Sequence, residues 1–235
     1  MLYDTMEVII MTEEKKITSV EQALEAVTND GMSLKYVPEE LQTKDVCLAA
    51  VRNNGVSLRY VRNQTEEICL EAVKNKSSAI RFVHNQTRNI CLESLWENAL
   101  AISYIHDKTK EICLAAVRIN GLAIKYISDQ TEEICLAAIE NIALSLKYIH
   151  NQTEKICLEA VRSRGMVLQF VHNQTEEICL EAVRNDGLAL QYVNHQTKEI
   201  CLAAVRNNPN ALKYVMIDVP GIEELAKDVT IEETH

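Results

Sequence analysis

One nine-residue segment returns along this chain every 22 residues, and it limits the possible folds more than any other feature. The segment reads Thr-Glu-Glu-Ile-Cys-Leu-Glu-Ala-Val at residues 65–73. All the cysteines of the 235-residue chain fall on this period: Cys47, Cys69, Cys91, Cys113, Cys135, Cys157, Cys179 and Cys201. A fixed period of roughly 20–50 residues is typical of stacked-repeat proteins, in which each repeat is covered only by its neighbours.

The start of each repeat predicts a helix of about ten residues. We number positions within a repeat from its threonine, which is position 0. Positions 3, 4, 7 and 8 are mostly Ile, Cys, Ala and Val, which is the spacing of one buried helix face. The threonine suits the N-cap, and the Arg or Lys at position 9 suits the carboxyl end of the helix dipole.

The second half of each repeat predicts another, shorter helix. Position 12 is glycine in five repeats, but the others have Ser77, Ala99, Ala143 and Pro209 there. Proline cannot take a positive φ, so we expect position 12 to begin the second helix rather than to end the first. Position 11 is then the N-cap, and it is Asn or Asp in six of nine repeats. Position 17 is always aromatic and lies among Leu and Val, so we expect it in the core.

These patterns predict an all-α fold, namely an α-solenoid of about nine 22-residue helix-turn-helix repeats that form an elongated superhelix. We expect an N-terminal segment at residues 1–18, the repeat array at 19–217, and a C-terminal capping helix and tail at 218–235. A two-residue insertion near Pro38 and Glu39 follows the first repeat.

Charge and cysteine usage argue against several classes of function. A net charge of −10 makes nucleic acid an unlikely partner, and no apolar run is long enough to span a membrane. Equivalent residues of stacked helices are about 8–10 Å apart, too far for disulfides, so the cysteines predict buried thiols in a reducing, cytoplasmic compartment. One thiol per repeat neither converges on a metal nor recruits a catalytic partner, so we expect no metal, no cofactor and no enzyme.

The segment from Asn173 to Val193 resembles the repeat of the family named domain of unknown function 4116. It reads Asn-Gln-Thr-Glu-Glu-Ile-Cys-Leu-Glu-Ala-Val and, after an arginine, Asn-Asp-Gly-Leu-Ala-Leu-Gln-Tyr-Val. The resemblance extends over about residues 19–216. It implies paired-helix repeats, an origin in a giant virus of amoebae or a bacterium, and a place in the host cytoplasm if viral. It brings no catalytic residues.

Departures from the repeat predict where a partner binds. Trp96 takes position 9, which is mostly Arg or Lys, and is either exposed or folded over a gap left by Ser94. Other departures and basic residues complete the predicted partner-binding set, namely Glu97, Glu140, Ile142, Arg118 and Lys125. The favoured function is a non-catalytic scaffold for protein–protein interaction, engaging a host factor or a larger assembly.

The alternative function is nucleic-acid binding along the basic rows at positions 9 and 16. It is weakened by the lack of aromatic residues at those positions. Position 19 carries a further recurrent side chain, at His84, His106, His150 and His172. These histidines either cap the carbonyls at the end of the second helix or form a pH-sensitive edge.

Overall fold

The computed structural model describes residues 16–232, and every regular element within that range is a helix. Residues 1–15 of the predicted N-terminal segment and residues 233–235 of the tail lie outside it. In each repeat a ten-residue α helix is followed by a six-residue 3-10 helix, here labelled η. The predicted all-α solenoid is confirmed.

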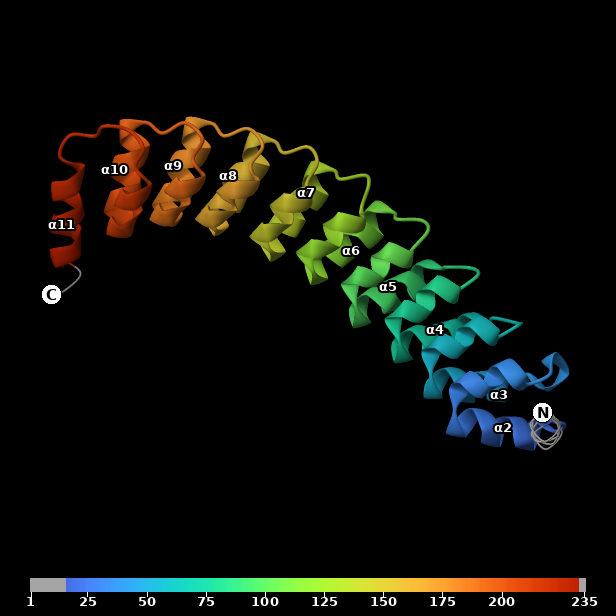
Figure 1. The fold of residues 1–235 in the computed structure, drawn as a ribbon. Helices are drawn as coiled ribbons and strands as arrows, with labels where there is room; N and C mark the ends of the chain where they lie inside the picture. The colour runs from blue at the N-terminus through green and yellow to red at the C-terminus, as the bar shows by residue number, and fades with distance from the viewer. Residues whose placement is uncertain (1–15, 233–235) are drawn as a thin grey trace, which may run out of the picture. The chain divides into compact units, whose positions relative to one another are not determined.

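The chain divides into two compact units, one ending at Asp107 and the other beginning at Lys108. Unit 1 contains α2 (Val20–Asn29), α3 (Lys44–Asn53), α4 (Glu66–Asn75) and α5 (Arg88–Glu97). Unit 2 contains α6 (Lys110–Ile119), α7 (Glu132–Asn141), α8 (Glu154–Ser163), α9 (Glu176–Asn185), α10 (Lys198–Asn207) and α11 (Ile222–Glu232). Within each unit consecutive α helices pack side by side (Figure 1).

Each α helix from α3 to α10 begins directly after its threonine, as predicted. The threonine hydroxyl accepts a hydrogen bond from the backbone N–H three residues later, at 3.3–3.5 Å. This bond satisfies one of the N–H groups that a helix leaves unpaired at its start. Ten residues on, position 11 ends the helix in an extended conformation.

The second helix begins at position 12, also as predicted, and is a 3-10 helix. In unit 1 these helices are η1 (Gly31–Tyr36), η3 (Gly55–Tyr60), η4 (Ser77–Phe82) and η5 (Ala99–Tyr104). In unit 2 they are η6 (Gly121–Tyr126), η7 (Ala143–Tyr148), η8 (Gly165–Phe170), η9 (Gly187–Tyr192) and η10 (Pro209–Tyr214). The Asn or Asp at position 11 caps six of them by accepting from the N–H two residues on.

The core of each unit is built from the apolar positions of both helices. All eight position-4 cysteines are buried and form no disulfide. The Ile or Val before each cysteine and the residues at positions 7 and 8 are buried with it. The 3-10 helix buries positions 12, 14 and 15, as Gly55, Ser57 and Leu58 illustrate, and Val61 directly after it, at position 18, is buried too. Because a 3-10 helix has three residues per turn, positions 12 and 15 share one face, which position 18 continues.

A glutamine directly before the threonine joins successive repeats. The Nε2 group of Gln64 donates to the carbonyl oxygens of Leu58 (3.3 Å) and Phe82 (2.9 Å), and its Oε1 accepts from the N–H of His84 at 3.0 Å. The same three bonds recur at Gln86, Gln130, Gln152 and Gln174. The position-19 histidines therefore take part through their backbone, while as residues they are exposed. Lys108 occupies the glutamine position at the start of unit 2.

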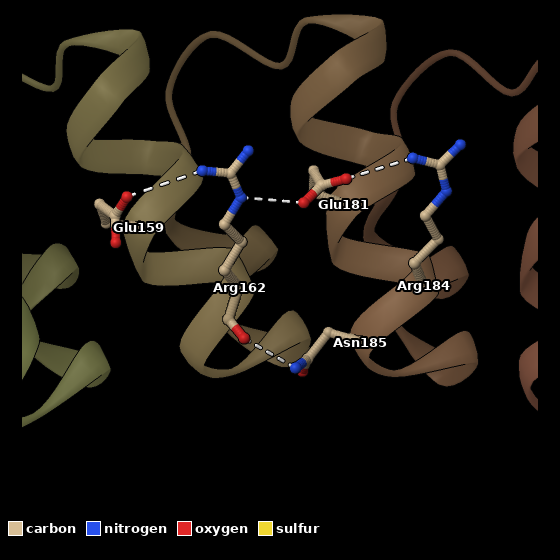
Figure 2. Close-up of polar contacts among 5 residues, drawn as sticks. All are labelled: Glu159, Arg162, Glu181, Arg184 and Asn185. Carbon is tan, nitrogen blue, oxygen red and sulfur yellow. Dashed lines mark hydrogen bonds and ion pairs between the residues drawn. The ribbon is translucent and has the colours of Figure 1, made fainter.

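An asparagine at position 10 forms a second link, which we call the asparagine clasp. Asn185 Oδ1 accepts from the N–H of Gly165 at 2.6 Å, and Asn185 Nδ2 donates to the carbonyl of Arg162 at 2.8 Å; Figure 2 draws the latter bond. The clasp recurs for Asn53, Asn75, Asn141 and Asn207 with Gly31, Gly55, Gly121 and Gly187.

The clasp requires glycine at position 12 of the preceding repeat. A Cβ on any of these five glycines would lie 2.3–2.4 Å from an alanine carbonyl oxygen of the next repeat, which no real Cβ tolerates. Where position 12 is Ser77, Ala99 or Ala143, position 10 of the following repeat is Glu97, Ile119 or Ser163 instead of asparagine. The two residues thus change together along the chain.

The irregular segments lie beside the first repeat and after the last. The insertion forms η2 (Glu39–Leu41), directly after Pro38. At the other end α11 packs on η10 and α10 and buries Ile222 and Ala226, in the place predicted for a capping helix. No helix in the described range has the length and apolar character to cross a membrane.

Candidate functional site

Position 9 forms an exposed row at the end of each α helix, and in α8 and α9 it belongs to a ladder of alternating charges (Figure 2). Arg162 Nε donates to Glu181 of the next repeat at 2.9 Å, and Glu181 also accepts from Arg184 at 3.2 Å. Glu159 lies 3.6 Å from Arg162. The hydrogen bond from Arg162 lowers the pKa of the Glu181 carboxyl. These exposed pairs largely neutralise one another and contribute little to stability.

Trp96 interrupts this row in α5. Its side chain is 73% exposed, so of the two predicted arrangements the exposed one is correct. Ser94 leaves no gap to fill, because it is buried and its hydroxyl donates to the Cys91 carbonyl at 2.7 Å. Glu97, the next residue, is exposed at the position where five other repeats have the clasp asparagine. Unit 1 thus presents a bare indole beside a carboxylate.

The predicted residues of unit 2 lie on two different elements. Arg118 and Glu140 both occupy position 9, in α6 and α7, and both are exposed. Ile142 is half-buried at the junction of α7 and η7, where it provides no side-chain cap. Lys125 lies on η6, with its Nζ 5.6 Å from the ring centroid of Tyr126 and 5.8 Å from that of Tyr148. Lys125 therefore belongs to a separate row.

That separate row contradicts the expectation that the position-17 aromatic residues lie in the core. Tyr36, Tyr104 and Tyr126 are exposed by 67%, 41% and 38%, and the other position-17 rings are half-buried. The Lys or Arg at position 16 lies over the ring of its own repeat and usually over that of the next. We call positions 16 and 17 the cation–aromatic row. The prediction failed because position 17 was placed in the core on the strength of its Leu and Val neighbours.

The eight cysteine thiols are buried, and burial disfavours their reactive thiolate form. Burial raises the pKa of Cys69 and Cys179 from 9.0 to about 11, and it raises the pKa of the other six thiols in the same direction. A nucleophilic cysteine needs the opposite shift, toward thiolate. Across residues 16–232 no three side chains of His, Cys, Asp or Glu gather closely enough to hold a metal ion.

This geometry defines a helical-repeat protein of the α-solenoid class, with buried thiols and long rows of exposed side chains. The family described as Domain of unknown function (DUF4116) matches the chain over residues 20–65, 109–153 and 175–218. These matches cover more than half of the chain, and the chain belongs to that family. No curated protein and no solved structure matches it.

Proposed function

We propose that this protein is a non-catalytic scaffold that binds a protein partner at the surface around Trp96. The observation that carries the proposal is the exposure of this one indole, 73%, in a row that otherwise holds charged side chains from α3 to α10. Exposed tryptophan is costly in water and is enriched at the centres of protein interfaces. Nothing in the packing of α5 requires it, because Ser94 and Leu95 beside it are already buried.

The neighbouring charge supports a polar rim around this anchor. Glu97 is exposed directly after Trp96. It occupies the repeat position at which asparagine forms the clasp elsewhere. In unit 2 we assign Arg118, Glu140 and Ile142 to a second contact region, because Glu140 reverses the charge of the position-9 row. The partner is a host protein or a subunit of a larger assembly.

The proposal is tested by quantitative capture. Immobilised full-length protein is compared with Trp96→Ala, and bound proteins from lysate are measured by isotope-labelled mass spectrometry. Losing an interfacial tryptophan costs about 2 kcal/mol or more, which is about a 30-fold loss of affinity. At least one captured protein should therefore fall steeply with Trp96→Ala, and Glu140→Arg should weaken the same capture.

Lys74→Ala is the matched control, because Lys74 occupies the same repeat position in α4 and is exposed. It should leave the capture unchanged. Trp96→Ala should unfold at the same urea concentration as the parent, since the side chain is mostly exposed. A capture profile that is identical for all three proteins would remove the Trp96 assignment.

A further inference from the structure

In unit 1 the cation–aromatic row contains two consecutive arginines that each lie near two rings. Arg59 Cζ lies 5.3 Å from the centroid of the Tyr60 ring and 5.2 Å from that of Phe82 in the next repeat. Arg81 repeats the arrangement, at 4.5 Å from Phe82 and 5.9 Å from Tyr104. Positive charges and ring faces therefore alternate over consecutive repeats on one surface.

A hollow of about 510 Å³ opens at the end of this row, next to the insertion. Its lining includes the cationic side chains of Lys35, Arg59 and Arg62 and the ring of Tyr60. The one acidic side chain in the lining is Glu39, with Oε2 4.0 Å from Arg62 Nε. The hollow is within the size range of small-ligand sites and carries excess positive charge.

We propose that the row and hollow of unit 1 bind single-stranded nucleic acid. Bases stack on aromatic faces, while the phosphates between them pair with cations, and surfaces that combine the two bind single strands without strong sequence preference. The position-17 rings offer the faces, and Arg59, Arg81 and Arg62 offer the charges. Positions 9 and 16 have no stacking aromatics, but position 17 supplies them: in unit 1, Tyr36 and Tyr104 are exposed, and Tyr60 and Phe82 are half-buried.

Two features favour a single strand over other anions. An acidic peptide would place carboxylates against ring faces, whose quadrupole is negative, so the rings would contribute nothing to its binding. A duplex keeps its base faces stacked inside and would contact the cations alone. The net charge of −10 opposes bulk attraction, so binding should depend on this row rather than on the protein as a whole.

The test uses the full chain and a fluorescein-labelled 20-nucleotide oligouridylate, with anisotropy measured at 50 mM NaCl. Arg59→Ala with Arg81→Ala should weaken binding about tenfold or more. It should also reduce the slope of log K against log salt by about 1.4, since each single-strand phosphate contact contributes about 0.7. Arg52→Ala with Lys74→Ala removes the same charge from position 9 of the same repeats, and it should change affinity less than twofold.

A second variant tests the rings without altering charge. Tyr60→Leu with Phe82→Leu should weaken binding about fivefold or more, with far-ultraviolet circular dichroism showing that the helices are retained. The proposal is overturned if the oligonucleotide does not bind, if the two arginine-to-alanine pairs behave alike, or if polyglutamate or a duplex competes as well as the unlabelled strand. Trp96→Ala should leave oligonucleotide binding intact, which separates this result from the proposed protein partner.

Discussion

Replacing Asn185 with alanine should destabilise unit 2 by about 2 kcal/mol, because it removes both bonds of one asparagine clasp. Gly165 is buried and its N–H is the first of η8, so it has no acceptor within its own helix. Leaving such a donor without a partner costs about 1–3 kcal/mol. The carbonyl of Arg162 lies at an exposed residue, so water replaces the lost amide there and the added cost is about 0.5 kcal/mol.

Urea unfolding of the full chain measures this loss, and Ser163→Ala is the matched control. Ser163 occupies the same repeat position in α8 and is exposed. Position 12 of the repeat before it is Ala143 rather than glycine, so no clasp is expected there. It should change stability by less than about 0.5 kcal/mol. Because repeat arrays can unfold in more than one step, hydrogen exchange of the Gly165 amide is measured as well. That amide should exchange much faster in Asn185→Ala.

A double-mutant cycle with Gly165→Ala tests whether the clasp asparagine and the glycine are energetically coupled. The added Cβ would lie 2.3 Å from the Ala182 carbonyl oxygen, so the two repeats must separate and the clasp is lost in Gly165→Ala itself. Adding Asn185→Ala should then cost little, which gives a coupling energy of about 1 kcal/mol or more. Additive single effects, or an Asn185→Ala no more damaging than Ser163→Ala, would refute the reasoning.

Three further changes test other parts of the repeat. Gln64→Ala should cost about 2 kcal/mol in urea unfolding, because it removes three hydrogen bonds that join two repeats. Ser57→Ala should raise stability by up to about 1 kcal/mol, since within the described range its hydroxyl is buried without a hydrogen-bond partner. Burial raises the pKa of Cys135 and Cys179 from 9.0 to about 11, so the native chain retains protons that the unfolded chain loses. The urea midpoint should therefore stay constant below about pH 9 and decrease from about pH 9 to 11. The decrease should be less steep in the double variant Cys135→Ala with Cys179→Ala.

The first helix and the start of the second could be predicted because nine repeats offer nine versions of each position. Pro209 alone excluded a left-handed cap at position 12, and the structure has no positive φ at any of the position-12 glycines. The recurrent threonine gave the helix start, and its hydroxyl bond is present in every copy from Thr43 to Thr197. Comparing the repeats with one another therefore shows which residues each position accepts, as an alignment of homologues does for a protein without repeats.

The surface position of the aromatic rings was predicted wrongly, because position 17 was judged from the apolar residues around it. Positions 15 and 18 are buried, as Leu58 and Val61 show, but Tyr60 between them is only half-buried. Tyr60 is the last residue of η3, and Arg59 lies over its ring. Nothing in a segment such as Gly-Val-Ser-Leu-Arg-Tyr shows whether its last ring lies in the core or beneath a guanidinium at the surface.

Comparison of the repeats with one another also separates structural departures from functional ones. At position 12 glycine gives way to serine or alanine only where the next position-10 asparagine is lost too, so both changes are explained by one contact. Around Trp96, Ser94, Leu95 and Glu97 also differ from the repeat, but Ser94 and Leu95 are buried within the unit, whereas the indole is exposed. An exposed indole that no contact within its unit accounts for favours a contact from outside the chain. On this argument Trp96 is the residue where loss of partner binding should be largest and loss of stability smallest.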